Sequence, residues 1–250
     1  MTRIITILTD FGTADGYVGE MKGVLATGAP GAALVDVTHD VAAHDVDGAR
    51  LALARYWRKF PEGTVHIVVV DPGVGGGRAA LAVASEGRFL VGPDNGVLSP
   101  ALLQPGMRCV SLPIPSGAAP TFHGRDVFAP AAAGLAQGIA LDALGEPFAE
   151  PLVRRTPEAT RRDDGAVAGV VITIDRFGNA VTNLMARRGG VLMVAGRQLA
   201  LSRTYGDVEH GAPVALVGSS GLVEIALRDG NAAAQLGLQR GSAVLLVPPA

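Results

Sequence analysis

Several residue types and patterns that define major protein classes are scarce in this chain of 250 residues. The single cysteine, Cys109, excludes an internal disulfide and a cysteine metal cluster, and its strand-like neighbours indicate a buried thiol. Lys and Arg number 21 against 23 Asp and Glu, so no basic excess is available to hold a nucleic-acid backbone. No apolar run approaches the ~20 residues of a membrane span, and the amino terminus meets Asp10 too early for a signal peptide. We therefore expect neither nucleic acid nor membrane as a partner, and a cytoplasmic location.

Aromatic residues are also scarce, at 4%, whereas hydrophobic residues make up 48% of the chain. The core must therefore consist of small aliphatic side chains, and the chain is long enough to bury a large one. Short apolar runs at 4–8, 33–37 and 65–70 are each followed by a polar turn, and 18–25 and 45–58 carry apolar residues at helical spacing. This alternation of strands and helices predicts an α/β sheet domain over residues 1–150.

A change of composition follows the predicted α/β domain. Residues 148–165 are rich in Arg, acids and Pro without periodicity, which indicates an interdomain linker. Beyond it, short apolar segments are bounded by Gly, Asp, Asn or Pro, and we expect strands at 168–174, 190–194, 197–201, 212–217, 222–226 and 242–247. Many short strands at this spacing predict a small β-barrel over residues 165–250.

The most informative stretch is HIVVVDPGVGGGR, from His66 to Arg78. Its uninterrupted β-branched run predicts a strand buried on both faces, as in the middle of a parallel sheet. The run ends at Asp71, followed by a glycine-rich turn that lets backbone N–H groups approach a ligand, and Arg78 brings a positive charge within reach. Ligands of open α/β sheets bind beyond the carboxyl ends of the strands. A simple strand-ending turn with a surface ion pair remains the alternative.

Other polar turns repeat this arrangement in the predicted α/β domain. Asp10 is the last residue of the first predicted strand, where a carboxylate can accept the hydroxyls of a ribose. Asp15, a few residues on, is suited to cap the following helix. Asn95 lies in the turn GPDNG, and His123 precedes a predicted helix, flanked by Gly124. Because a histidine there has little core to join, we expect it to serve as a group that titrates near neutral pH.

Two turns of the predicted barrel are more polar than a core requires. Asp175, Phe177 and Asn179 share one tight turn, in which an aromatic ring could stack on a purine while the polar groups bind its edge. A plain turn explains the pattern equally well. Ser219 and Ser220 form a second such turn, just before the predicted strand at 222–226.

Six motifs, in order and with compatible spacing, resemble the S-adenosyl-L-methionine (SAM) hydroxide adenosyltransferase family, the adenosine-forming SAM hydrolases related to fluorinase and chlorinase. The motifs are TDFGTADGYVGEMKGV, VVVDPGVGGGR, GPDNGVL, TFHGRDVFAPAAA, IDRFGNAVTN and VGSSGLVEIA. The resemblance covers essentially the whole chain. It implies an amino-terminal α/β domain, a carboxy-terminal β-barrel and a homotrimer, with SAM bound between neighbouring subunits.

The resemblance also implies roles for individual residues. The hydrolase triad falls on Asp71, Arg78 and His123, while Asp10 matches the acid that holds the ribose hydroxyls. Asp175, Phe177 and Asn179 match residues around the methionine portion and the adenine, and Ser219 and Ser220 match the turn that meets the base or its flank. Asp15 and Asn95, from the polar turns described above, are further substrate-binding candidates. His44 stands where relatives often carry an aromatic residue over the sugar.

The implied reaction is attack of water on ribose C5′ of SAM, which releases adenosine and methionine. We expect no metal and no cofactor, because methionine leaves as a neutral thioether and a cation would repel the sulfonium. The pattern leaves open whether Asp71 or His123 accepts the proton. Halide transfer is disfavoured, since family halogenases carry a serine at the position of Gly124 and a tyrosine and a threonine at those of Asp71 and Val74.

Two further alternatives remain at the level of sequence. One is a metal-dependent phosphoesterase with Asp10, Asp15, Asp71 and His123 as ligands. The other is a protein that binds SAM or a nucleoside without catalysis. Sensitivity to a chelator would indicate the first, and ligand that survives long incubation unaltered would indicate the second.

Overall fold

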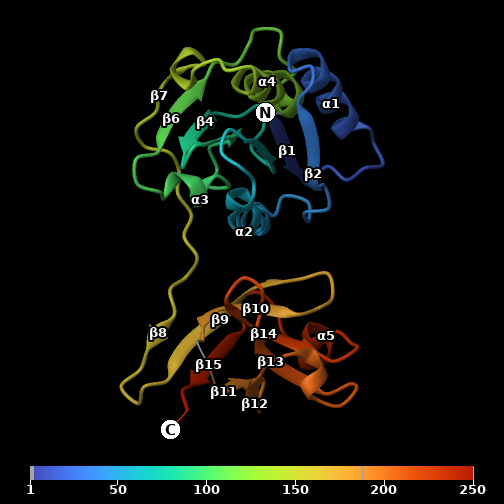
Figure 1. Ribbon diagram of the computed structural model, residues 1–250, viewed down its shortest axis with the longest axis vertical. Coiled ribbons are helices and arrows are strands. Elements are labelled where there is room, and N and C mark those ends of the chain that lie inside the picture. Colours follow the sequence, from blue (N-terminus) through green and yellow to red (C-terminus); the bar gives the residue numbers. More distant parts are fainter. Residues whose placement is uncertain (1–2, 187–188, 250) are drawn as a thin grey trace. The chain divides into compact units, whose positions relative to one another are not determined.

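A computed structural model of the protein describes residues 3–186 and 189–249 (Figure 1). The chain divides into two compact units, Met1–Arg155 and Thr156–Ala250. The division lies inside the stretch 148–165, where the composition changes. The first unit is a mixed α/β sheet domain and the second a closed β-barrel, so the predicted fold class is confirmed.

The first unit is built on a seven-stranded sheet with the order β2-β1-β3-β5-β4-β6-β7. The strands are β1 Ile4–Thr9, β2 Ala33–Thr38, β3 Val65–Val69, β4 Ala80–Ser85, β5 Arg88–Pro93, β6 Arg108–Leu112 and β7 Glu146–Pro147. The first four in this order, β2, β1, β3 and β5, run parallel, whereas β4, β6 and β7 pair antiparallel. The carboxyl ends of β1, β3 and β5 therefore meet at one edge of the sheet, where open sheets of this kind bind ligands.

Helices cover both faces of this sheet (Figure 1). They are α1 Tyr17–Gly28, α2 Val46–Tyr56, η1 Trp57–Lys59, α3 Ser99–Leu102, the π-helical turn η2 Gly124–Phe128, α4 Ala129–Ala136 and η3 Leu141–Ala143. On one face Ile67 packs in a cluster with α1 and α4, and on the other Val68 packs with α2 and α3. Burial on both faces explains why β3 carries no polar alternation. One detail was predicted wrongly: the N-cap of α1 is Gly16 rather than Asp15, and no side chain caps the helix.

A polar side chain is fully buried at the start of β3. His66 is completely shielded from solvent, and its Nδ1 lies 2.7 Å from Oγ1 of Thr6 on β1. The rings of Tyr56 and Phe60 meet it edge to face, with centroids 5.5 and 5.7 Å away. Burial, together with the nearby charge of Arg88, lowers the pKa of His66 to about 3. This imidazole is therefore neutral in the folded protein at any ordinary pH.

The second unit is a seven-stranded barrel. Its order is β10-β14-β13-β12-β11-β15-β9, closed by pairing of β10 with β9, and β8 is added beside β9. The strands are β8 Thr160–Arg161, β9 Val167–Ile174, β10 Ala180–Met185, β11 Val191–Val194, β12 Arg197–Ser202, β13 Pro213–Val217, β14 Leu222–Leu227 and β15 Ala243–Val247. The short helices η4 Tyr205–Asp207 and α5 Ala232–Leu236 complete it. Closure leaves few unpaired strand edges.

Strand β10 is not among the strands expected from the sequence. Thr182 is fully buried, and its hydroxyl donates to the carbonyl of Val223 at 2.8 Å. Asn183 bonds two backbone groups, accepting from Val170 N and donating to Pro157 O, both at 2.8 Å. Over the described parts of the chain, no helix combines the length and the apolar character needed to cross a membrane.

Candidate active site

The centre of the site is the loop of residues 71–78, which joins β3 to β4. Because β5 lies between these strands in the sheet, the loop passes the carboxyl end of β5. Its first and last residues form an ion pair: Arg78 Nε donates to Asp71 Oδ1 at 3.0 Å, and Nη2 donates to Oδ2. The side chains are 11% and 4% exposed, respectively. This two-point contact fixes the orientation of the Asp71 carboxylate.

His123 joins this pair from another element. It is the N-cap of η2, and its Nδ1 lies 3.0 Å from Nη2 of Arg78. Burial is the main reason that the pKa of His123 lies below its usual value; the charge of Arg78 adds to this, and Asp71 and Asp126 oppose it. The neutral ring therefore prevails near pH 7. A guanidinium can only donate, so Nδ1 accepts and the proton of the neutral ring is on Nε2.

Charged neighbours hold the segment that carries His123. Asp126 accepts from the backbone of Ala119 at 2.9 Å and from two nitrogens of Arg125 at 2.7 and 2.9 Å. The same guanidinium reaches Glu20 on α1 at 2.6 Å. The contact with Arg125 is the main reason that the pKa of Asp126 is lowered. These bonds hold residues 119–126 in one conformation and fasten them to α1, and in this way they position His123.

Three aromatic residues beside the site were not singled out from the sequence. Phe11, Tyr17 and Phe122 meet edge to face, with centroids 5.4 to 6.2 Å apart. Phe11 directly follows Asp10 and Phe122 directly precedes His123. A Cβ on Gly124 would lie 3.2 Å from Met21 Sδ and within 3.4 Å of two of these rings, so even alanine would be tight there.

Asp10 lies at the end of β1, at the same edge of the sheet. Its Oδ2 accepts from the backbone N–H of His44 at 2.8 Å, and His44 has a positive φ of 66°. The preceding residue, Thr9, is fully buried and its Oγ1 lies 2.8 Å from His39 Nδ1. One carboxylate oxygen of Asp10 therefore stabilises the left-handed backbone conformation of His44. Asp15 is exposed in the following turn.

Asn95 lies in the turn after β5, next to the loop of residues 71–78. Its side-chain amide donates to the carbonyl of Val70 at 2.9 Å, and its side-chain oxygen accepts from Val97 N at 3.1 Å. The structure thus places the side chain of Asn95 against Val70, the residue before Asp71, with both ends of its amide bonded to backbone groups.

The candidates in the barrel gather around two turns. Asp175 Oδ1 accepts from the backbone of Phe177 and of Asn179, both at 2.9 Å, while Oδ2 accepts from the side chain of Asn179 at 3.0 Å. This turn holds the ring of Phe177 outward, 74% exposed. Ser219 and Ser220 form an exposed turn between β13 and β14.

Two further residues connect these turns. Glu224 on β14 is buried, and a Cβ on Gly218 would collide with its carboxylate, so Glu224 lies directly against the Ser219 turn. The hydroxyl of Tyr205 lies 3.5 Å from Glu224. Burial, together with the charges of Glu224 and Asp175, raises the pKa of Tyr205. Tyr205 therefore lies near both polar turns, although nothing in its own sequence context indicated a role.

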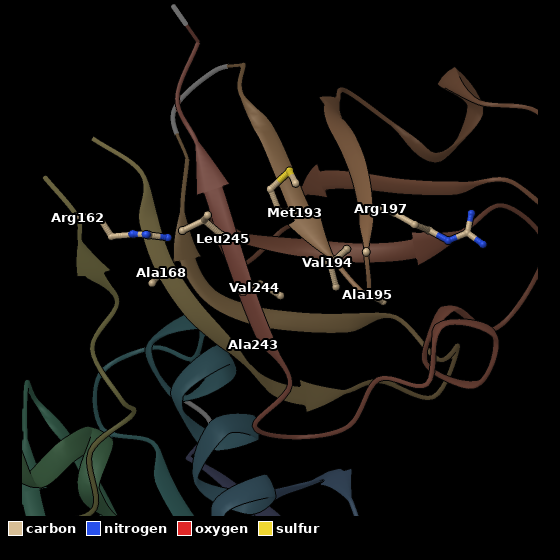
Figure 2. A pocket seen from close by; sticks show the side chains of 10 residues that line it. Arg162, Ala168, Met193, Val194, Ala195, Arg197, Ala243, Val244 and Leu245 are labelled. Atoms are coloured by element: carbon tan, nitrogen blue, oxygen red, sulfur yellow. The ribbon is translucent and has the colours of Figure 1, made fainter. Parts of the chain in front are cut away.

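A separate hollow of about 360 Å³ lies on the barrel, against β9, β11 and β15 (Figure 2). Its floor is apolar, with Met193, Val194 and Leu245, and Arg162 and Arg197 lie at its margins. None of the predicted site residues lines it. Within residues 3–186 and 189–249, no group of three or more His, Cys, Asp or Glu side chains is arranged to hold a metal ion.

Gly75 gives a first test of how tightly the loop of residues 71–78 is packed. It has a φ of +75°, and a Cβ there would lie 2.5 Å from the carbonyl oxygen of Pro120. We expect Gly75→Ala to destabilise the protein by about 2 to 4 kcal/mol, since backbone strain and overpacking add. Gly31 has φ +84° and no neighbour within 4 Å. Gly31→Ala should therefore cost only about 1 kcal/mol. Urea unfolding of both variants measures the difference, and equal losses would contradict it.

The fold and the site together define a class. This is a protein with an α/β sheet unit and a closed β-barrel unit, and its α/β unit holds Asp71, Arg78 and His123 together in one cluster beyond the strand ends. Residues 5–145 match the SAM hydroxide adenosyltransferase N-terminal domain, and residues 169–245 match the C-terminal domain of the same family. The chain belongs to the SAM hydroxide adenosyltransferase family.

Individual relatives agree with this membership. The chain is 44% identical to the (R)-S-adenosyl-L-methionine hydrolase of Thermus thermophilus, covering 98% of this chain and 100% of that one. It is 43% identical to the enzyme of the same name from Salinispora arenicola, over 96% of each. A fluorinase from Actinopolyspora mzabensis is 29% identical, over 96% of each. An uncharacterized conserved protein from Thermotoga maritima has a similar crystal structure, with a TM-score of 0.88 at 30% identity, over 97% of this chain and 99% of that one.

Proposed function

We propose that this protein hydrolyses SAM to adenosine and L-methionine, and that it acts on the (R) epimer at the sulfonium. The observation that carries the proposal is the contact of Arg78 with both Asp71 and His123, in a chain whose two family domains are both present. The epimer follows from relatives at 43–44% identity that are named (R)-S-adenosyl-L-methionine hydrolase.

The chemistry requires one water and no acid. Attack of the water oxygen on ribose C5′ forms a C–O bond while the C5′–S bond breaks, and the electron pair of that bond goes to sulfur. Methionine leaves as a neutral thioether, so no group has to protonate it. The protein has to hold water in line with the C–S bond, which can contribute up to ~7–11 kcal/mol for ideally oriented reactants, and to accept one proton.

The geometry favours Asp71 as the proton acceptor. Nδ1 of His123 accepts from Arg78, so in the neutral ring Nε2 already carries a hydrogen and is suited to donate to the water or substrate. The carboxylate of Asp71 accepts from Arg78 at each oxygen and keeps lone pairs for the water. In this scheme Arg78 orients both Asp71 and His123. The negative charge of Asp71 offsets the positive charge of Arg78, so the pair does not repel the sulfonium of SAM.

Halide transfer and metal-dependent hydrolysis are less well supported. Gly124 replaces the serine of family halogenases, and the close packing of Met21 and two rings around it leaves little room for that serine. We propose that the reaction uses neither metal nor cofactor, since a neutral leaving group needs no Lewis acid and a cation would repel the sulfonium.

The substrate contacts, the assembly and the location are proposals that rest on the family resemblance. Asp10 would accept the ribose hydroxyls. The other contacts would come from Asp15, Asp175, Phe177, Asn179, Ser219 and Ser220. In a cytoplasmic homotrimer, the α/β unit of one subunit and the barrel of its neighbour would contribute to one site.

A product assay tests the function directly. Purified protein is incubated separately with (R)-SAM and (S)-SAM, in chloride-containing and in halide-free buffer with a chelator present, and the nucleosides are separated by chromatography. We expect adenosine and methionine in equal amounts from (R)-SAM in both buffers, and much slower turnover of (S)-SAM. A halogenated adenosine, dependence on metal, or intact SAM after long incubation would each contradict the proposal.

A further inference from the structure

The turn of residues 93–96 supports the loop that carries Asp71. The turn follows β5, which lies beside β3 in the sheet, so it meets the loop where the loop leaves β3. There the side-chain amide of Asn95 donates to the carbonyl of Val70 at 2.9 Å. Since Val70 directly precedes Asp71, this bond fixes the backbone from which the Asp71 carboxylate projects.

The same turn also holds the other end of the loop. The backbone N–H of Asp94 donates to the carbonyl of Ala79 at 2.9 Å, and Ala79 directly follows Arg78. Nη1 of Arg78 itself lies 3.3 Å from that carbonyl. Two consecutive residues of one turn therefore hold both ends of the loop, and with them both members of the Asp71–Arg78 pair.

Residues 151–155 cover this turn, and we call them the strap. The backbone N–H of Leu152 donates to the carboxylate of Asp94 at 2.7 Å. Nε of Arg154 donates to the backbone carbonyl of Asn95 at 2.9 Å. The strap therefore holds both Asp94 and Asn95, the two residues that hold the ends of the loop.

Further contacts attach the strap firmly. The backbone N–H of Arg154 donates to Ser99 Oγ at 2.8 Å, and Nη1 lies 3.1 Å from the carboxylate of Asp47 on α2. Gly96 has a φ of +92°, and a Cβ there would lie 2.3 Å from Cγ of Arg154. The strap therefore packs on the turn so closely that only glycine fits beneath it.

We propose that Asn95 is a positioning residue for Asp71 and Arg78, and that the strap residue Arg154 acts through it. The inference rests on the proposed hydrolysis only for its kinetic readout. Both ends of the Asn95 amide are used on backbone groups, Val70 O and Val97 N, so its contribution is to hold the loop rather than to contact the reacting atoms.

The test compares two asparagines with the same bonding pattern. Asn183 in the barrel also accepts from one backbone N–H and donates to one backbone carbonyl, but in the other unit of the chain. We expect Asn95→Ala to lower kcat for (R)-SAM by about 10- to 100-fold, with KM changed less than about threefold, because small displacements of reacting groups are costly. Asn183→Ala, with a similar loss of melting temperature, should keep kcat within about twofold of wild type.

A second readout does not depend on turnover. NMR titration of the His123 ring protons reports its surroundings, in which Arg78, Asp71 and Asp126 are the charged groups. Release of Arg78 in Asn95→Ala should move the pKa of His123 toward its ordinary value, and Asn183→Ala should leave it unchanged. If wild-type protein makes no adenosine, the proposed function fails, while this titration still tests the positioning.

Arg154→Lys extends the test if Asn95→Ala does not fold. Lysine keeps a positive charge opposite Asp47 but cannot reproduce the Nε bond to Asn95, so kcat and the pKa of His123 should change in the same direction by a smaller amount. The proposal is overturned if the variants at Asn95 and Arg154 keep the wild-type kcat and His123 pKa, or if Asn183→Ala changes both as much.

Discussion

Replacement of Asp71 by asparagine is expected to lower kcat for SAM hydrolysis by about 1,000-fold, within the range that general-base catalysis contributes. Asparagine has nearly the same shape, but its NH₂ group must face one of the two Arg78 nitrogens that donate to Asp71. The variant therefore loses both the proton acceptor and half of the contact that orients Arg78. Steady-state kinetics and a direct SAM-binding titration measure the effect.

The binding measurement separates chemistry from folding. We expect the Kd for SAM to change by less than about tenfold, because one hydrogen-bonding or ionic contact is lost at most. Asp142→Asn provides the matched control, since Asp142 pairs with Arg108 at 2.8 Å on the exposed surface. An exposed pair contributes about 0 to 1 kcal/mol, so that variant should keep full activity. Turnover by Asp71→Asn within tenfold of wild type would remove Asp71 from the proposed mechanism.

Mild acid is expected to destabilise the protein through His66. Its pKa is about 3 in the folded state because of burial, and about 6.5 when the chain is unfolded. Between these values the unfolded state binds a proton that the native state does not, so stability falls as pH decreases below 6.5 and is fully present above it. The loss approaches ~1.4 kcal/mol per pH unit for one such proton, or about 2 to 3 kcal/mol at pH 4.5.

Urea unfolding between pH 5 and 7.5 measures this slope, above the range in which most carboxylates titrate. His66→Gln should flatten it, because glutamine can bond Thr6 and does not titrate. Thr6→Val removes the bonding partner of His66 but leaves the ring buried, so it should lower stability and keep the slope. A slope that is unchanged in His66→Gln would assign the acid sensitivity to other groups.

Some of this architecture follows from sequence patterns because the physical constraint is local. A strand buried on both faces has to be apolar throughout, so β3 and the turn after it could be placed from the run ending at Val70. A glycine-rich turn between an acid and an arginine similarly indicated that Asp71 and Arg78 meet. His123 was indicated by its position at a helix start, which the structure confirms.

Other features depend on long-range contacts that no local pattern contains. Strand β10 carries Thr182 into the core, which is tolerated because its hydroxyl donates to the carbonyl of Val223 on the neighbouring strand β14. The aromatic group of Phe11, Tyr17 and Phe122 comes from segments far apart in the chain. The position of β5 between β3 and β4 was also not predictable, and it is what places Asn95 under the loop of residues 71–78.

The strap determines where the two units can be exchanged by protein engineering. Consider a chimaera that joins this α/β unit to the barrel of a relative. With the junction at residue 150, Leu152 and Arg154 would come from the relative, and the strap contacts that support the loop of residues 71–78 would be lost. A junction after Arg155 keeps every strap contact within the parent sequence. Residues 148–165, which the sequence indicates as a linker, therefore belong in part to the α/β unit. Recombination between relatives has to keep residues 151–155 together with that unit.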